Sequence, residues 1–431
     1  MKIENTAMKL STSILLVLCF VFSFACSEPD NAGKKNLSEG TDNSIKFYLK
    51  RTEADPSSYL DYNRLAAAYM QKARETGDTL YYDKAYKSLE RSLSISPKNY
   101  NGTVLMAMAH ISKHEFDDAL QYALKAVELE PENSYGYGIL GDSYLDLGDL
   151  TKAEASYNRM LTLDPSLDSY SRLSNLRVVQ GDTAGAIEAM NNAYEAGLKN
   201  VRTSRENLAW TQVMLGSIYF NQGNLSDAEK HYKKSLEIMP GYYLGLEHLA
   251  EINAVRGNYA EAEKLYKQVL EINPAPEFYI ALAEVYKSQG KEKEAEKLES
   301  SALGIYEERV KEGDPGYLRA LALYYADKGT NLDKALALAE RDLNIRKDVH
   351  GYDTLAWVHY KRGEFKKAQY ASKKSLATGT RDAQLFYHAG MISIANGDYG
   401  KAREYLNLAL ETNPHFNSEE VSKELKSLNT L

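Results

Sequence analysis

The sequence predicts an all-α solenoid built from repeated helix–turn–helix units, and three observations lead to this fold class. First, prolines recur at intervals of 34 residues, at Pro97, Pro131 and Pro165 and again at Pro240 and Pro274. Second, the prolines close similar amphipathic phrases, such as "ALQYALKAVELEP" and "AEKLYKQVLEINP". Third, a helix that ends at a glycine precedes most of these phrases. A unit of two such helices cannot bury its apolar face alone, so neighbouring units must stack.

The first helix of each unit, helix A, has a recurrent register. It carries a Leu-Gly or Leu-Ala pair, an aromatic residue three positions later and a glycine four positions beyond that. This register resembles the tetratricopeptide repeat, and residues 134–165 match it best. The resemblance implies a right-handed superhelix of about ten repeats, which run approximately 59–97, 100–131, 134–165, 167–197, 209–240, 243–274, 276–306, 315–348, 349–380 and 383–414.

Small residues at fixed places in the repeat have a physical reason. On helix A they are Gly141, Gly216 and Gly390, where we expect contact with helix B of the same repeat. The matching small residues on helix B are Ala153, Ala228, Ala262, Ala295, Ala368 and Ala402. Glycines that end helix A and open the turn are Gly148, Gly181, Gly223, Gly257, Gly290, Gly363 and Gly397.

One glycine pattern has a competing interpretation. Gly136, Gly138 and Gly141 spell G-x-G-x-x-G, and Asp164 follows about twenty residues later, as in dinucleotide-binding loops. That fingerprint requires a strand before the first glycine, whereas residues 117–131 have a helical period. We therefore interpret Gly141 as a helix-packing residue and predict no cofactor.

The N-terminus has the features of an export signal. Lys2 and Lys9 precede the uncharged run 10–25, which is shorter than the ~20 residues of a membrane-spanning helix. The run ends in "SFAC" and resembles a bacterial lipoprotein signal, which implies lipidation of Cys26. Phe24 departs from the small residue usual at its position, and an ordinary cleaved signal with an incidental Cys26 is the alternative.

Composition excludes several classes of function. The formal charge of −8, with mixed signs, argues against nucleic-acid binding, which needs a basic stripe. The two cysteines are Cys19 and Cys26, so the body after Cys26 has no disulfide, thiol catalyst or cysteine metal site. The sequence also contains no G-x-S-x-G and no P-loop, and we predict that the protein is not an enzyme.

The chain is expected to divide into five segments. They are a signal peptide at 1–25, a flexible polar tether at 26–55, repeats 1–4 at 56–200, repeats 5–10 at 201–414 and a capping helix at 415–431. The boundary at residue 200 follows from the inserted stretch "GLKNVRTSREN" and from the missing proline at the end of repeat 4. The last helix is needed because a solenoid must cover its final apolar face.

A metal site is the main chemical alternative. His110 and His114 lie four residues apart on one helix, and Glu115, Asp117 and Asp118 follow. Both histidines, however, fall at the aromatic and glycine positions of repeat 2, where packing and turn roles explain them. We predict no metal.

The resemblance implies that partners bind on helix A, at the second, fifth, ninth and twelfth positions of each repeat. The residues predicted to contact a partner are Tyr135, Asp142, Asn175, Trp210, Phe220, Glu247, Glu251, Glu284, Trp357 and Tyr387. The four rings in the later repeats are expected to be apolar anchors that need not pack between repeats. The three glutamates, on adjacent repeats, are expected to form an acidic wall without a nearby basic residue at equivalent positions. The Lys, Arg and Asn residues of the family's carboxylate clamp are only scattered here, so that clamp is not predicted.

These features together predict a non-catalytic scaffold or adaptor lipoprotein that holds a partner protein or peptide. The signal resembles those of Bacteroidetes-type lipoproteins, which implies a place in the bacterial cell envelope, at the outer membrane. Regulation of cell-wall enzymes, envelope assembly or secretion would suit such an adaptor. A small-molecule or glycan receptor for nutrient uptake is the alternative, although the inserted loops of such receptors are missing.

Overall fold

A computed structural model of the chain describes residues 34–76 and 80–428, and all regular structure within these ranges is helical. The first helices are α1 (Lys34–Ala54), α2 (Tyr59–Thr76), α3 (Leu80–Ile95), α4 (Tyr100–Ser112), α5 (Phe116–Leu129), α6 (Ser134–Asp146), α7 (Leu150–Leu163) and α8 (Leu167–Val179). They are followed by α9 (Thr183–Lys199), α10 (Arg205–Asn221), α11 (Leu225–Ile238), α12 (Tyr243–Val255), α13 (Tyr259–Ile272), α14 (Pro276–Ser288) and α15 (Glu292–Lys311). The last are η1 (Pro315–Tyr317), α16 (Leu318–Lys328), α17 (Leu332–Ile345), α18 (Val349–Lys361), α19 (Phe365–Ser375), η2 (Leu376–Thr378), α20 (Ala383–Ala395), α21 (Tyr399–Thr412) and α22 (Ser418–Leu428).

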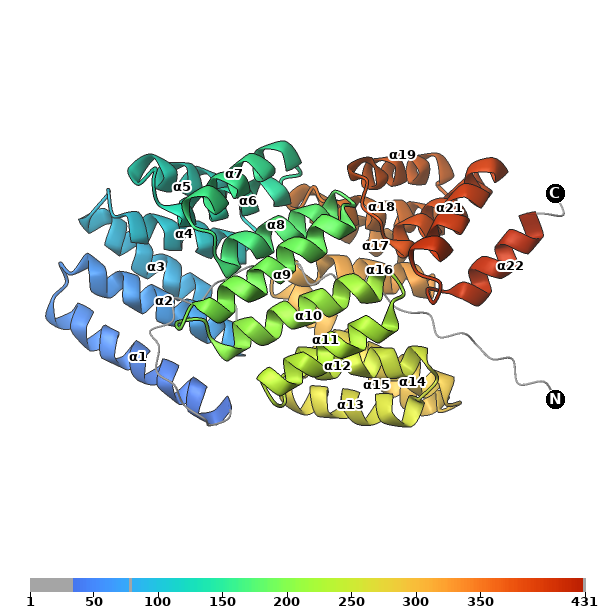
Figure 1. The fold of residues 1–431 in the computed structure, drawn as a ribbon, viewed down its shortest axis with the longest axis horizontal. Coiled ribbons are helices and arrows are strands. Elements are labelled where there is room, and N and C mark those ends of the chain that lie inside the picture. Colours follow the sequence, from blue (N-terminus) through green and yellow to red (C-terminus); the bar gives the residue numbers. More distant parts are fainter. Residues whose placement is uncertain (1–33, 77–79, 429–431) are drawn as a thin grey trace. The chain divides into compact units, whose positions relative to one another are not determined.

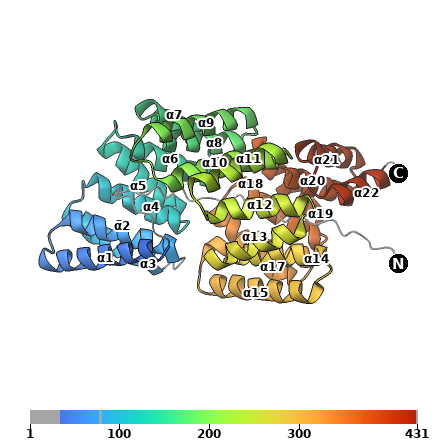
Figure 2. The ribbon, with the colours of Figure 1, turned by 60° about the horizontal axis from the view of Figure 1, so that its bottom comes forward.

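Successive helices pair as the repeats predict, which confirms the all-α solenoid. Helix A contacts its own helix B, as α6 contacts α7 and α10 contacts α11, and helix B contacts the next helix A, as α5 contacts α6 and α11 contacts α12. Figure 1 shows this alternation along the chain, and Figure 2 shows the same pairs from a second side.

The described residues divide into two compact bodies, and the division falls inside α8. The N-terminal body ends at Leu173 and the C-terminal body begins at Ser174. This differs from the boundary at residue 200 expected from the insertion, because the inserted residues extend helices instead of separating them. α9 and α10 have 17 residues each, against 14 in α5 and α7.

The turn between helix A and helix B needs a left-handed residue. Gly148, with φ of 82°, and the equivalent glycines of later repeats all have positive φ, as predicted. Repeat 2 has His114 at this place, and its φ is 58°. His114 is therefore the turn residue of repeat 2, in a conformation that a non-glycine residue rarely adopts.

Helix packing explains the glycines inside helix A. A Cβ atom added at Gly216 would lie 2.4 Å from the ring of Tyr232, and one added at Gly390 would lie 2.7 Å from Leu406. The matching alanines of helix B, Ala153 among them, are fully buried. The predicted small-residue contacts between paired helices are confirmed.

The predicted tether is partly wrong, because residues 34–54 form α1. This helix packs on α2, with Ile45 and Thr52 buried. Lys72 Nζ lies 2.8 Å from Asp42 Oδ1 and Arg51 Nε lies 2.8 Å from Asp61 Oδ1, so two ion pairs join the helices. The segment looked like a linker because it is polar, and Phe47 and Leu49 remain exposed; burial of Ile45 and the two ion pairs hold the helix against α2.

The end of the chain contains the predicted capping helix, as α22. Val421 and Leu428 are buried against the last repeat, and α22 contacts α21. Among the described residues, no helix is long and apolar enough to cross a membrane. Residues 1–25 and Cys26, on which the lipoprotein prediction depends, lie outside the described residues.

Candidate functional site

The predicted binding residues of the C-terminal body lie on its helices A, which are neighbours in space. α10 contacts α12 and α12 contacts α14, while α18 contacts both α16 and α20. We call the exposed side of these helices the helix A face. Some of the predicted binding residues on these helices remain exposed to solvent, whereas others are covered by neighbouring repeats.

Three of the four predicted apolar anchors are buried, so they are corrected to core residues. Phe220, Trp357 and Tyr387 are only 3%, 5% and 6% exposed. Trp357 stacks on His388 with a centroid distance of 3.9 Å, and its Nε1 donates to Asp327 Oδ1 at 2.7 Å. The register placed these rings on helix A correctly, but adjacent repeats approach closely enough to enclose them.

Trp210 differs from the other three rings. It lies on α10, is part-exposed and packs against the hydrophobic cluster that Phe220 and Leu249 help to form. Its role as an anchor for a partner stays a prediction. Asn175, on α8, is also part-exposed, and the same holds for its predicted role.

Two of the three predicted glutamates form a cluster with a histidine that the sequence analysis did not single out. His248 Nδ1 lies 3.1 Å from Glu247 Oε2 and 3.2 Å from Glu251 Oε2. The ring of His248 stacks on Tyr232, with a centroid distance of 4.8 Å, and its Nε2 lies 3.4 Å from Ser217 Oγ. The cluster is thus fixed by helices α10, α11 and α12.

Burial controls protonation in this cluster. The pKa of Glu247 is raised to about 7, mainly by burial; His248 acts to lower it, and the carboxylates of Glu251 and Glu277 act to raise it. Burial opposes the charged form of His248, but the two carboxylates outweigh this and raise the pKa of its imidazole. Near neutral pH the Glu247 carboxyl is therefore only partly ionised, which reduces the negative charge of the cluster.

The third glutamate is paired with a lysine that the sequence analysis did not single out. Glu284 Oε1 lies 2.6 Å from Lys287 Nζ on the same helix, and Lys287 also contacts Glu299 on α15. The acidic wall is thus partly neutralised by Lys287 and by His248. The spacing of Glu284 and Lys287, three residues apart on a helix, was the signal that could have revealed the pair.

The residues of the N-terminal body that were predicted to bind a partner also contact other residues of the protein. Asp142 accepts hydrogen bonds from Arg172 Nε at 2.9 Å and from the Tyr157 hydroxyl at 2.9 Å. Arg172 is only 2% exposed, so this is a buried ion pair between α6 and α8. Asp142 is corrected to a structural residue. Tyr135 is part-exposed, with its hydroxyl 3.8 Å from Met108 Sδ, and its binding role stays a prediction.

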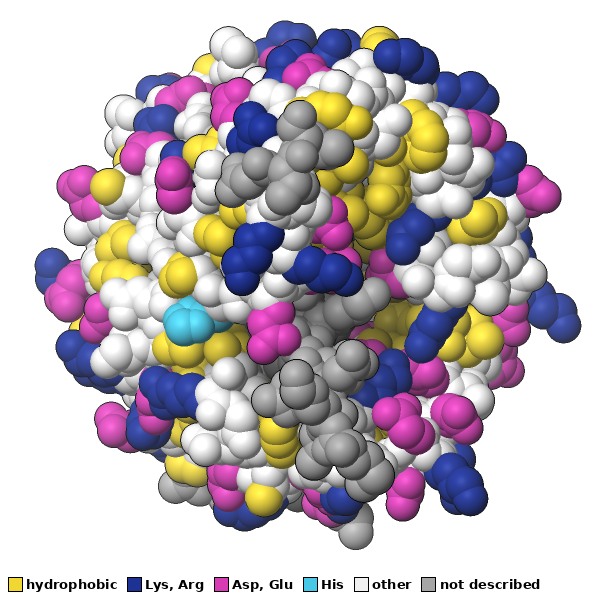
Figure 3. Space-filling view, turned by 90° about the vertical axis from the view of Figure 1, so that its right-hand side faces the viewer, with side chains coloured by type: hydrophobic (Ala, Val, Ile, Leu, Met, Phe, Trp, Pro, Cys, Tyr) yellow, Lys and Arg dark blue, Asp and Glu magenta, His cyan; other side chains and the backbone are white. Residues whose placement is uncertain are grey.

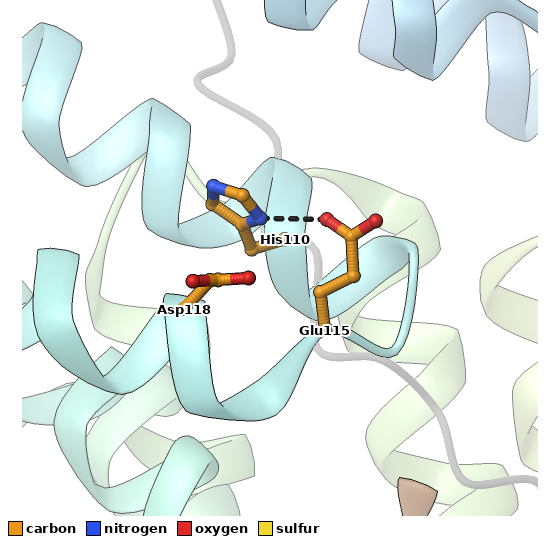
Figure 4. A group of neighbouring side chains, drawn as sticks. All are labelled: His110, Glu115 and Asp118. Atoms are coloured by element: carbon orange, nitrogen blue, oxygen red, sulfur yellow. Dashed lines mark hydrogen bonds and ion pairs between the residues drawn. The ribbon is translucent and has the colours of Figure 1, made fainter.

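The histidine pair considered for a metal is separated by the fold. His110 Nδ1 lies 2.7 Å from Glu115 Oε2, and Asp118 completes a group of possible ligands within 4.8 Å of one another (Figure 4). His114 is the turn residue and does not belong to that group.

The contact between His110 and Glu115 has an equivalent in another repeat, which favours a structural role for these residues. In repeat 9, His359 Nδ1 lies 2.8 Å from Glu364 Oε2, at the same place relative to the turn. There, Arg362 and Lys367 contact the carboxylate as well. A histidine near the end of helix A that contacts a glutamate of the following turn therefore occurs in two repeats of this chain.

Surface composition suits protein recognition. Figure 3 shows patches of hydrophobic side chains on one face, interspersed with charged side chains of both signs. A mixture of apolar area and polar rim is typical of protein interfaces.

The repeat register, the paired helices and the left-handed turns define the class of protein. Four family models, each described as tetratricopeptide repeat, match residues 104–168, 165–240, 219–284 and 383–416. The chain is a tetratricopeptide repeat protein, a class whose members generally bind protein or peptide partners on a non-catalytic scaffold.

Its relatives belong to the same class. The chain is 32% identical over 148 residues to Heat shock protein STI1 of Saccharomyces cerevisiae, covering 32% of this chain and 25% of the relative. It is 36% identical over 85 residues to the Hsp70-Hsp90 organizing protein of Triticum aestivum, covering 20% and 15%. The chain thus spans a quarter or less of these two relatives. A TPR repeat-containing protein of Methanocaldococcus jannaschii is 21% identical, covering 85% of this chain and 72% of the relative.

The chain is also similar to solved structures, at low sequence identity. A human IFIT1 dimer with PPP-AAAA has 16% identity and a TM-score of 0.47, covering 80% of this chain and 84% of that one. Yeast Tom70 has 14% identity and a TM-score of 0.36, covering 85% and 96%.

Proposed function

We propose that this protein is an adaptor of the bacterial cell envelope, lipid-anchored through Cys26, that holds a segment of a partner protein on its helix A face. The single observation that carries the binding proposal is the repeat scaffold itself, which presents adjacent helices A side by side. The envelope location rests on the "SFAC" signal, and envelope assembly, secretion or cell-wall regulation are the processes that it suits.

The accessible residues of the helix A face indicate the chemistry of the partner. Trp210 offers part-exposed aromatic area, and Glu247, Glu251 and Glu284 offer carboxylates that are 13%, 13% and 21% exposed. A neutral or basic segment with an apolar side chain fits this surface. Because His248 and Lys287 already compensate part of the charge, we expect only a modest slowing of association at high salt.

Site-specific photo-crosslinking in intact envelopes tests the proposal. A photoreactive residue in place of Trp210 or Glu251 should capture the same envelope protein. Matched controls carry it in place of Lys233 or Lys264, which are 61% and 62% exposed on helices B. Capture from the helix B positions alone, or no capture from any position, would contradict binding on the helix A face.

A further inference from the structure

Two pairs of loops that are far apart in the sequence meet inside the C-terminal body. The turn after α8 lies against the loop at residues 379–380, so repeat 4 touches repeat 9. The turn after α10 lies against residues 413–414, so repeat 5 touches repeat 10. In a solenoid each repeat ordinarily contacts only its neighbours in the sequence. These contacts are therefore additional to the packing that builds the repeats.

Hydrogen bonds join both pairs of loops. Thr380 Oγ1 donates to the carbonyl oxygen of Val179 at 2.5 Å, and Asn413 Nδ2 donates to the carbonyl oxygen of Phe220 at 3.1 Å. Thr380 and Asn413 are 4% and 5% exposed. Both acceptors lie in the last turn of a helix A, and the carbonyl oxygen of Phe220 also accepts from Gly223 N at 2.8 Å. A side chain from a distant repeat thus donates a hydrogen bond to the end of each of these helices.

The glycines of these two turns allow a close approach of the loops. A Cβ atom at Gly181 would lie 2.1 Å from the carbonyl oxygen of Gly379, and one at Gly223 would lie 2.5 Å from Pro414 Cδ. The equivalent turn glycines Gly257 and Gly290 have nearly the same φ, 77° and 74°, but nothing lies within 4 Å of their added Cβ atoms. Among the turn glycines described in the C-terminal body, those of repeats 4 and 5 alone lie this close to another segment.

Two apolar clusters of this body each follow the chain. One runs from Ala209 to Val285 and the other from Ala302 to Leu428, and neither contains residues of both repeat 5 and repeat 10. The described contacts between the distant repeats are the two hydrogen bonds and the close approach of the loops. Such a contact is weak compared with the packing between neighbouring repeats, and it can open without unfolding them.

We propose that the loops at 179–181, 220–223, 379–380 and 413–414 form a clasp that closes the superhelix of the C-terminal body and opens reversibly. Opening would change the curvature of the helix A face, and so the width of the partner it admits. This consequence for binding rests on the proposed function, whereas the clasp itself does not.

Paired glycine substitutions in the purified full chain test the clasp. The Gly181→Ala, Gly223→Ala variant carries two left-handed alanines that clash with the opposite loops. The Gly257→Ala, Gly290→Ala control carries the same backbone strain, but nothing lies within 4 Å of its two added Cβ atoms. We expect a larger radius of gyration by small-angle X-ray scattering, and faster amide exchange at residues 379–382, for the first variant only. Equal behaviour of the two variants would overturn the proposal.

A second variant, with side chains of similar shape, tests the clasp if alanines at positive φ prevent folding. Thr380→Val and Asn413→Asp remove the two donors with little change of shape, and should speed amide exchange at 180–183 by about tenfold through a larger open fraction. Exchange unchanged from wild type would contradict the clasp. If the variants show no clasp but photo-crosslinking captures a partner, the proposed function stands and the clasp is contradicted. If the clasp is demonstrated but no partner is captured, only the proposed function is contradicted.

Discussion

The ring of Tyr157 occupies the space that a side chain on Gly141 would need. A Cβ atom built at Gly141 would lie 2.3 Å from Tyr157 Cε1, so α6 and α7 touch at this glycine. The helix before α6 is α5, and Asn133 caps the start of α6 by accepting from Tyr135 N. The G-x-G-x-x-G pattern is therefore part of a helix pair, without the strand that a dinucleotide-binding loop requires.

Gly141→Ala should destabilise the protein. The added methyl group must displace Tyr157, which is fully buried, and overpacking of this kind costs about 1–3 kcal/mol. Urea unfolding followed by circular dichroism measures the loss, and hydrogen exchange should place it in α6 and α7.

The matched control for this prediction is Gly304→Ala. Gly304 is exposed within α15, and nothing lies within 4 Å of an added Cβ there. Because glycine weakens a helix interior, this change should stabilise by about 0.5–1 kcal/mol. A Gly141→Ala variant as stable as Gly304→Ala would show that Gly141 has no packing role.

Arg172→Met should be costly, because it leaves the carboxylate of Asp142 without its buried counter-charge. Removal of one partner from a buried ion pair costs about 3–5 kcal/mol, whereas replacing both partners by apolar residues is often neutral. We expect the double variant Arg172→Met, Asp142→Leu to recover most of the loss. Denaturant unfolding of the single and double variants measures both effects.

Arg159→Met provides the control for a surface pair. Arg159 lies 2.9 Å from Glu132, and the two side chains are 39% and 81% exposed. The loss there should stay below about 1 kcal/mol. Equal losses from Arg172→Met and Arg159→Met would refute the importance of the buried pair.

Glu247→Gln should stabilise the protein above pH 7. Burial raises the pKa of Glu247 to about 7, well above the ~4.3 of an unfolded chain. Between these values the unfolded state ionises first, so the wild-type protein loses stability as pH rises. The variant lacks this group and should gain about 1–3 kcal/mol at pH 8, with the gain vanishing near pH 4. Thermal unfolding across this pH range measures it.

Glu263→Gln should change the stability of the protein in the opposite direction, by destabilising it at high pH. Hydrogen bonds from Lys267 and Lys291 lower the pKa of Glu263 to about 2, so its carboxylate stabilises the fold above pH 4. The variant should be less stable than wild type at pH 8, and the difference should disappear as pH falls from about 4 to about 2. Parallel pH profiles of the two variants would contradict the assignment of Glu247.

Cys26→Ser should release the protein from the membrane fraction, because the proposed lipid is attached to this side chain. Fractionation of envelopes and metabolic labelling with a fatty acid measure the outcome. Cys19→Ser, within the same apolar run, should leave both unchanged. Labelling that persists in Cys26→Ser would place the anchor elsewhere.

The sequence by itself determined the repeat, because the repeat is made of local signals. The proline period, the turn glycines and the small residues of paired helices all concern residues within one or two repeats of each other. Helical periodicity and backbone conformation act over that range, so Gly141 and Gly148 were predicted correctly. The same register also placed Trp210, Glu247 and Trp357 on helix A.

Only the tertiary structure decided which of those residues are available to a partner. Burial of Trp357 depends on how closely successive repeats pack, and pairing of Asp142 with Arg172 depends on a residue in the next repeat. The contact of Asn413 with Phe220 joins positions 193 residues apart. A linear pattern contains no information on such approaches, because the curvature of the whole superhelix sets them.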